Sequence, residues 1–298
     1  MSLPPLDVPG LLKSFGLRPD KSLGQNFLVD TPALHRVVDC ADIQSFDRVL
    51  EIGPGLGSLT RLLAQRADRV IAVELDGRLL PVLNNVLAGL VNVQIVHGDI
   101  LKIDPLNWIS AGTALKPAVD GAGGLEMTAG GYLVVANIPY YITSAVIRHL
   151  LEAKVKPQRM ILTIQQEVAE RICAGPGDMS LLALSVQVYG TPGIVARIPA
   201  DAFYPSPQVD SAVVRIDVHI TPLFPPNELA MVFRLAKAGF SQKRKNLRNA
   251  LAGGMAWSSG DAESLLKAVG IDPSRRAETL SLEEWGLLAN QVLIKPRK

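Results

Sequence analysis

The sequence is poor in the residues that build metal centres and disulfide frameworks. Among 298 residues there are two cysteines and four histidines. Cys40 and Cys173 form no C-x-x-C pair, and the histidines are scattered without the spacing of metal ligands. We therefore expect free thiols, a reducing compartment and no metal site.

An excess of charge and a leader-like segment are also lacking. The chain holds 30 Lys and Arg against 28 Asp and Glu, and a net charge of +2 does not by itself indicate a nucleic-acid partner. The start, MSLPPLDVPG, has no basic segment followed by an apolar one, unlike a secretory signal. The uncharged stretch between Glu126 and Arg148 contains Asn137 and Pro139, which favours a buried strand and its loop over a membrane helix. We expect a cytoplasmic protein with no membrane partner.

Apolar residues are abundant and come in short runs. They make up 48% of the chain, enough to fill a sizeable core. Five β-rich runs alternate with helical stretches, which is typical of a parallel sheet with helices on both faces. These runs are 48–53, 69–75, 93–99, 132–137 and 159–165.

The second half of the chain changes character. LALSVQVYG (182–190) and VDSAVVRIDVHI (209–220) predict an antiparallel hairpin at the sheet edge. TPLFPPN (221–227) is typical of a linker, and only helical patterns follow from Glu228. We predict an α/β domain over 1–220, with a Rossmann-like sheet of five parallel strands plus the edge hairpin, and a small all-helical domain over 221–298. The Gly- and Ala-rich segment 109–131 predicts a surface loop.

Three of the predicted strands end in residues suited to a nucleoside. VLEIGPGLGSLT is a strand followed by a glycine turn, where Gly53 and Gly55 let the backbone turn sharply and approach a ligand. Glu74 ends the next strand and could accept hydrogen bonds from a ribose, and Asp99 could accept from an adenine amine. Singly, these residues could be a plain turn, a surface acid and a helix cap. Together, E-x-G-x-G-x-G with two strand-end acids resembles the S-adenosylmethionine-dependent methyltransferases.

The fourth strand ends in NIPYY, an unusual continuation of a buried strand. Asn137-Ile138-Pro139-Tyr140 is similar to the motif of enzymes that methylate an amino group on a planar ring. The Asn137 side-chain oxygen and the Ile138 carbonyl could accept the hydrogens of the amine and aim its lone pair. Pro139 fixes the backbone, and Tyr140 offers a face for an extruded base. Such a transfer needs alignment rather than an acid–base pair.

Over nearly its whole length the chain resembles the ribosomal small-subunit RNA adenine dimethyltransferases, with the erythromycin-resistance RNA methyltransferases as relatives. The resemblance is carried by KSLGQNFLVD (21–30), FYPSPQVDS (203–211), FSQKRKNLRNAL (240–251) and IDPSRRAETLS (271–281). It implies that Gln25, Asn26 and Leu28 lie at the cofactor. The matching motif positions, also implied to contact it, are Gly53, Glu74, Asp99 and Asn137.

The same resemblance implies a second aromatic face for the target base, from Phe203. Prolines 205 and 207 would stiffen that loop and hold the ring outward. The implied substrate is the exocyclic nitrogen of two adjacent adenosines near the 3′ end of small-subunit ribosomal RNA, in a pre-small-subunit particle. We expect a monomer that uses S-adenosylmethionine.

The helical tail carries a basic stretch. No acid occurs from Ala230 through Gly260. Lysines and arginines at this density can neutralise phosphates, although such a run can also be only a solvated face. The predicted RNA-binding residues are Lys243, Arg244, Lys245 and Arg248.

Other functions stay open at this stage. A resistance-type methyltransferase would act on large-subunit RNA instead, and a non-catalytic nucleic-acid-binding assembly factor could retain the fold. The intact NIPY motif and glycine turn disfavour the assembly factor. A nicotinamide dehydrogenase is disfavoured because the G-x-G-x-x-G spacing is absent. The segment 179–185 departs from the family pattern, so docking on a ribosomal particle could differ in detail.

Overall fold

The computed structural model describes residues 3–104, 131–242 and 244–294. The chain forms two compact units, of which unit 1 comprises 1–169 and 193–218, and unit 2 comprises 170–192 and 219–298. The start of the last segment lies next to the predicted boundary after residue 220. Residues 170–192, however, cluster with the helical tail. A separate function for each unit stays a prediction, and most of the loop predicted over 109–131 lies outside the described residues.

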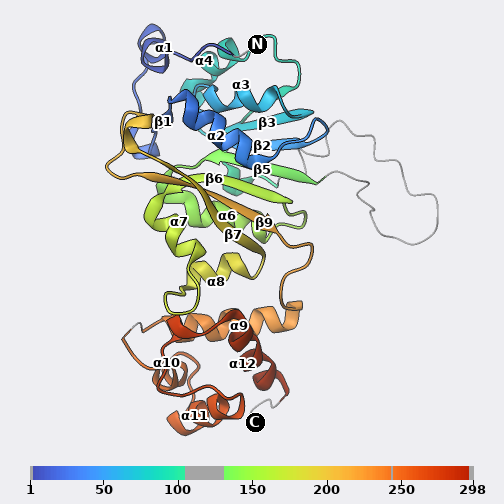
Figure 1. The fold of residues 1–298 in the computed structure, drawn as a ribbon, viewed down its shortest axis with the longest axis vertical. Coiled ribbons are helices and arrows are strands. Elements are labelled where there is room, and N and C mark those ends of the chain that lie inside the picture. Colours follow the sequence, from blue (N-terminus) through green and yellow to red (C-terminus); the bar gives the residue numbers. More distant parts are fainter. Residues whose placement is uncertain (1–2, 105–130, 243, 295–298) are drawn as a thin grey trace, which may run out of the picture. The chain divides into compact units, whose positions relative to one another are not determined.

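A mixed sheet of seven strands organises the described part of the fold (Figure 1), in the order β4–β3–β2–β5–β6–β9–β7. The first five strands in this order are parallel, and β9 is antiparallel to β6. The predicted architecture is therefore confirmed. The strands are β2 (Arg48–Ile52), β3 (Arg69–Glu74), β4 (Val93–His97), β5 (Tyr132–Asn137), β6 (Arg159–Gln165), β7 (Gly190–Ile198) and β9 (Ser211–Val218), with a separate pair of β1 (Phe27–Leu28) and β8 (Phe203–Tyr204).

Helices cover both faces of the sheet: α2 and α3 lie on one face and α6 on the other (Figure 1). This is why the central strands are apolar almost without interruption. The helices are α1 (Val8–Ser14), α2 (Thr31–Ala41), α3 (Ser58–Ala64), α4 (Leu80–Val86), α6 (Thr143–Leu151), α7 (Gln166–Cys173), α8 (Leu181–Gln187), α9 (Pro226–Phe240), α10 (Leu247–Gly254), α11 (Ser259–Ala268) and α12 (Leu282–Ile294).

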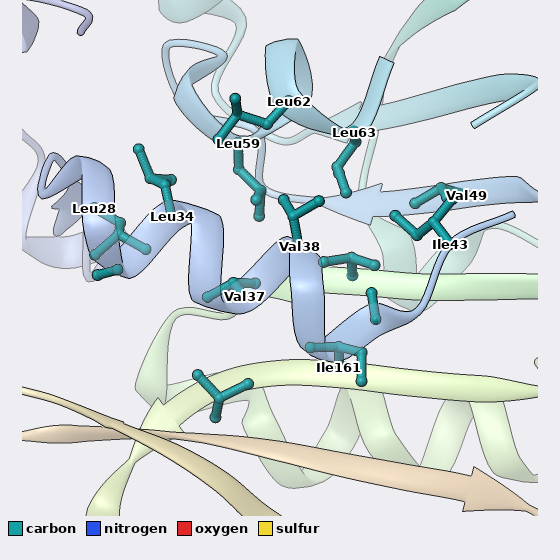
Figure 2. Packing of buried hydrophobic residues seen from close by; sticks show 14 of the residues in the cluster. Leu28, Leu34, Val37, Val38, Ile43, Val49, Leu59, Leu62, Leu63 and Ile161 are labelled. Atoms are coloured by element: carbon teal, nitrogen blue, oxygen red, sulfur yellow. The ribbon is translucent and has the colours of Figure 1, made fainter. Parts of the chain in front are cut away.

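The core beneath α2 follows from its sequence pattern. The Asp30 carboxylate accepts a hydrogen bond from the Ala33 N–H at 2.7 Å and so begins the helix. Apolar side chains then recur every three or four positions and form one stripe. Figure 2 shows this stripe packed between α3 and the strands of the sheet. Its labelled members are Leu34, Val37 and Val38, facing Leu59, Leu62, Leu63, Val49 and Ile161.

One of the two strands predicted for the edge hairpin was wrong. Residues 181–187 form helix α8, and the edge strand begins only at Gly190. The Ser180 hydroxyl accepts a hydrogen bond from the Ala183 N–H at 3.1 Å, which starts a helix at this point. In addition, β9 lies between β6 and β7, so the edge strand is β7.

Helices α8, α10 and α12 of unit 2 pack against α9. The ring centroids of Phe240 on α9 and Trp285 on α12 lie 5.7 Å apart. The Phe233 ring of α9 is stacked on Tyr189, with the ring centroids 6.4 Å apart. Gly239 leaves room for Trp285, since a Cβ there would lie 2.7 Å from the indole ring. Among the helices of the described ranges, none is long and apolar enough to cross a membrane.

Candidate cofactor and substrate site

A pocket opens at the carboxyl ends of the parallel strands. The chain runs outward from β2 through β3 to β4 and then returns to β5 on the other side of β2. Ligands of open α/β sheets bind at such a switch point. A pocket of about 800 Å³, counting the part open to solvent, lies here.

The glycine turn after β2 brings the backbone to the pocket wall. Gly53 and Gly55 have φ angles of +68° and +59°, which other residues rarely adopt. A Cβ on Gly55 would lie 2.8 Å from the Phe27 ring, so glycine is required there for space as well as for backbone conformation. The Gly55 N–H donates a hydrogen bond of 3.1 Å to the Glu74 carboxylate. The turn and the strand-end acid therefore support each other.

Two carboxylates line the same pocket. Glu74 is 5% exposed, and burial raises its pKa, although backbone N–H donors from Asp76 and Gly55 oppose that rise. The Asp99 carboxylate is less buried and accepts a hydrogen bond from the Leu101 N–H at 3.0 Å. Asp99 is thus both a cap for the following turn and a wall of the pocket. Both acids therefore line the pocket that a ligand would enter.

Asn137 has a fixed orientation at the end of β5. Its side-chain N–H donates a hydrogen bond of 2.9 Å to the carbonyl of Asn26, so the Oδ1 atom is left as the acceptor end. The next residue, Ile138, donates its N–H to the carbonyl of Thr163 at 3.2 Å, which anchors the loop on β6. The amide that handles an amine would thus be held before any substrate arrives.

Tyr140 is positioned by a residue from a distant strand. Its hydroxyl forms a hydrogen bond of 2.9 Å with the hydroxyl of Ser211, which is fully buried at the start of β9. Burial raises the pKa of the Tyr140 phenol, so the group is neutral at physiological pH. The ring lines the pocket and is held at its far end.

A comparison with protein families identifies the family to which the chain belongs. The model for "Ribosomal RNA adenine dimethylase" matches residues 16–292. The chain belongs to the ribosomal RNA adenine dimethylase family. It is 45% identical over 286 residues to a "Ribosomal RNA small subunit methyltransferase A" of Dehalococcoides mccartyi (strain CBDB1), covering 96% of this chain and 92% of that protein. A protein of the same name from Alkaliphilus metalliredigens (strain QYMF) is 38% identical over 291 residues, with 97% and 96% covered.

Solved structures show the same fold. The crystal structure of the 23S rRNA methyltransferase ErmE has a TM-score of 0.68 and 26% identity, covering 89% of this chain and 99% of that one. A dimethyladenosine transferase from Plasmodium falciparum has a TM-score of 0.70 and 22% identity, covering 90% and 98%. At that identity the second match supports the fold alone.

As a member of the dimethylase family, the chain is an S-adenosylmethionine-dependent rRNA adenine methyltransferase. The chemistry of the pocket fits this cofactor. Glu74 and Asp99 would supply acceptors for ribose hydroxyls and an amine, and Ile52, Val73 and Ile100 would supply apolar walls for a nucleoside. Within the described ranges, no cluster of three His, Cys, Asp or Glu side chains is placed to hold a metal.

The pocket brings together ten of the predicted site residues. They come from the N-terminal segment, the glycine turn, two other strand ends and the NIPY loop, which are far apart in the sequence. Their roles toward cofactor and substrate stay predictions. The ten are Gln25, Asn26, Gly53, Gly55, Glu74, Asp99, Asn137, Ile138, Pro139 and Tyr140.

Two predicted site residues lie elsewhere. Leu28 and Phe203 face each other across the β1–β8 pair and are buried in the apolar cluster under α2. Successive side chains of a strand alternate in direction, so Tyr204 points outward and is 40% exposed. The expectation that the prolines hold Phe203 outward is therefore wrong for this structure. Its stacking role stays a prediction. Leu28 lines a smaller cavity shared with Gly53 and Asn137.

Three residues at the site were not found by sequence reasoning. Ser211 holds Tyr140, and Asp76 and Arg78 hold the N-terminal segment that lines the pocket. The local signals were an acid two positions after Glu74 and Ser211 itself, the last residue of the motif FYPSPQVDS. The partners are separated by 51 to 71 residues, so no spacing pattern connects them.

The predicted RNA-binding cations of unit 2 differ in their surroundings. Arg244 and Lys245 are exposed between α9 and α10, and Lys243 lies outside the described residues. Arg248 instead pairs with Glu263 of α11 at 3.2 Å. It therefore joins two helices, whereas Arg244 and Lys245 remain the better candidates for phosphate contacts.

Proposed function

We propose that this enzyme dimethylates the exocyclic nitrogen of two adjacent adenosines near the 3′ end of small-subunit ribosomal RNA, with a pre-small-subunit particle as its substrate. The observation that carries the proposal is the fixed Asn137 amide, which lines the pocket together with Tyr140. The names of the curated relatives support the small subunit over the large one. We further propose that it acts as a monomer in the cytoplasm.

Methylation of an adenine amine requires that a weak nucleophile be aligned with the methyl group. The lone pair of the adenine amine is delocalised into the ring. The Asn137 Oδ1 atom and the Ile138 carbonyl accept its two hydrogens, which favours a pyramidal nitrogen with its lone pair directed along one line. Tyr140 stacks on the extruded base, a contact worth about 1–3 kcal/mol.

S-adenosylmethionine supplies an electrophilic methyl group on a sulfonium. Transfer of that methyl group to the amine nitrogen would leave the cofactor as a thioether, and the methylated nitrogen would then lose a proton to water. No acid or base among the pocket residues has to drive this step, because effective positioning alone can contribute about 7–11 kcal/mol. In this proposal Glu74 and Asp99 bind and orient the cofactor.

The 26% identity to the 23S rRNA methyltransferase ErmE makes large-subunit RNA the second candidate substrate. The deciding experiment offers labelled S-adenosylmethionine with unmodified small-subunit particles, large-subunit particles, or both in competition. We expect label on small-subunit RNA even in competition. Label mainly on large-subunit RNA would favour the second candidate. Cofactor binding without transfer to either would contradict both.

A further inference from the structure

The N-terminal segment Asp20–Asn26, here called the covering segment, lies against both sides of the pocket. On one side the Asn26 carbonyl accepts the side-chain N–H of Asn137 at 2.9 Å. Gly24 packs there against the loop, since a Cβ on it would lie 3.4 Å from the Tyr141 ring and 3.5 Å from Pro139. The covering segment therefore touches the loop that handles the amine.

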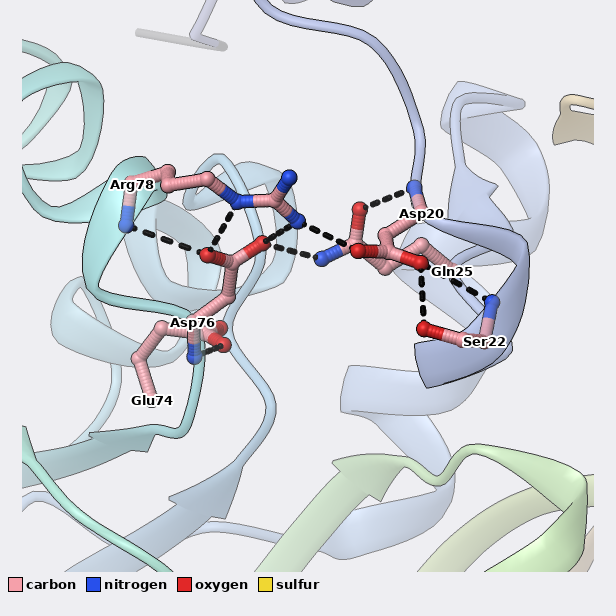
Figure 3. Close-up of polar contacts among 6 residues, drawn as sticks. All are labelled: Asp20, Ser22, Gln25, Glu74, Asp76 and Arg78. Carbon is pink, nitrogen blue, oxygen red and sulfur yellow. Dashed lines mark hydrogen bonds and ion pairs between the residues drawn. The ribbon is translucent and has the colours of Figure 1, made fainter.

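On the other side the segment is held by charges. Asp20, Gln25, Asp76 and Arg78, here called the Arg78 cluster, are drawn in Figure 3. The Arg78 Nε and Nη2 atoms donate to the two Asp76 oxygens, each at 2.8 Å, and Nη2 also donates to Asp20 at 2.7 Å. The Gln25 side-chain N–H donates to Asp76 at 2.8 Å, and its carbonyl oxygen accepts the Asp20 N–H at 2.8 Å.

The burial of Asp76 explains why this cluster needs its arginine. Asp76 is 6% exposed, and its two oxygens accept from Arg78 and Gln25. Hydrogen bonds from Arg78 lower the pKa of Asp76, so the carboxylate stays charged at neutral pH. Without the guanidinium, two carboxylates would face each other across the contact. A lysine could not replace the fork, because one ammonium lacks the planar bidentate geometry.

The cluster also connects to the cofactor side of the pocket. The Asp76 N–H donates to Glu74 at 2.8 Å, and the other Glu74 oxygen accepts the Gly55 N–H at 3.1 Å. A continuous series of contacts thus runs from the glycine turn, through Glu74 and the Arg78 cluster, along the covering segment to Asn137.

We propose that the Arg78 cluster is a positioning device that sets the covering segment and, through the Asn26 carbonyl, the orientation of the Asn137 amide. Arg78, Asp76 and Asp20 act through Asn26 and do not touch the base. The proposal rests on the proposed function only for the consequence of misplacing Asn137. Its structural part, the hold on the covering segment, stands without it.

The structural part is tested by amide hydrogen exchange on ligand-free protein. Arg78→Met removes the fork, and Asp20→Asn removes one charge while keeping an acceptor for the Ser22 N–H. We expect both variants to exchange residues 20–26 about tenfold faster or more, since local opening follows local contacts. The matched control is Arg66→Met, which breaks a 2.9 Å ion pair with Asp39 elsewhere in unit 1. Unchanged exchange in both variants, or equal acceleration in the control, would overturn the proposal.

The functional part is tested by a double-mutant cycle on turnover. If Arg78 acts through Asn137, then Asn137→Ala should cost at least about fivefold less in kcat when Arg78→Met is already present. Losses that simply multiply would contradict that route. Arg78→Lys is a second variant that keeps the positive charge and is expected to fold. It should also accelerate amide hydrogen exchange of residues 20–26. If the wild-type protein methylates no adenosine, the proposed function fails, whereas the exchange result still decides the cluster.

Discussion

A buried carboxyl group beside the glycine turn makes stability depend on pH. Glu51 on β2 is 1% exposed, and its Oε2 atom has no hydrogen-bond partner among the described residues. Burial raises its pKa from 4.5 to about 8, and the nearby charge of Glu74 adds to the rise. The folded state therefore holds this proton more tightly than the unfolded state. The resulting stabilisation is fully present below pH 4.5 and is lost as the pH rises towards about 8.

The size of the effect follows from the two pKa values of Glu51. From 4.5 to neutral pH there are roughly 2.5 pH units, each worth about 1.4 kcal/mol, so about 3 to 4 kcal/mol is lost by pH 7. Glu51→Gln has the same shape and cannot ionise. The amide of this variant would leave one polar atom without a hydrogen bond, as the protonated Glu51 carboxyl group does, so the two differ mainly in ionisation. We expect the variant to match the wild type near pH 4 and to exceed it by about 3 to 4 kcal/mol at pH 7.

The assay is urea unfolding of ligand-free protein at several pH values between 4 and 8.5. Glu152→Gln, which changes an exposed carboxyl group at the end of α6, is the control and should stay within about 0.5 kcal/mol of wild type. A Glu51→Gln difference that stays constant across this pH range would refute the reasoning. So would a variant that is less stable than wild type at pH 7.

Three further predictions concern the pocket. Asn137→Ala should lower kcat by about 100-fold and change the cofactor Kd only a few-fold, measured by single turnover and calorimetry, since it removes alignment; near-normal turnover would contradict its role. Gly55→Ala should abolish cofactor binding by calorimetry, because its Cβ would meet the Phe27 ring at 2.8 Å; a Kd near wild type would show that the turn can relax. Ser211→Ala should lower kcat about fivefold, because it removes the hydrogen bond that holds Tyr140, and a hydrogen bond contributes about 1 kcal/mol. An equal loss in Tyr140→Phe is expected, and an additive double variant would argue against the contact.

The strand ends of the site were predictable because their signals are local. Gly53 and Gly55 follow an apolar run, and positive φ angles are what glycines at such a turn supply. Glu74 and Asn137 end neighbouring runs, and parallel strands bring their carboxyl ends to one edge. The capping box of Ser281 and Glu284 is an equally local feature, with the Ser281 N–H donating to Glu284 at 2.8 Å.

The helix at 181–187 was mistaken for a strand because its burial pattern fits both periods. Leu184, Val186 and Val188 are buried at alternate positions, as in a strand. Ala183 and Val186 also share a helical stripe, and the cap at Ser180 decides in favour of the helix. A capping residue therefore carried more information here than alternation did.

The Arg78 cluster and the burial of Phe203 could not be predicted, because both depend on pairing between distant segments. Arg78 and Asp20 are 58 residues apart in the sequence. At such a separation nothing in the sequence distinguishes this pair from any other arginine and acid. Phe203 turns inward only because β8 pairs with Leu28 of β1 in one register. A shift of one residue would have exposed it and buried Tyr204 instead.

The most direct test is nucleoside mass spectrometry of small-subunit RNA after incubation of unmodified particles with the enzyme and S-adenosylmethionine. We predict two adjacent adenosines carrying two methyl groups each on the exocyclic nitrogen, near the 3′ end, and their loss with Asn137→Ala. Methyl groups on a ring nitrogen or a ribose, or an unchanged product with Asn137→Ala, would contradict the role of the Asn137 amide in presenting an adenine amine.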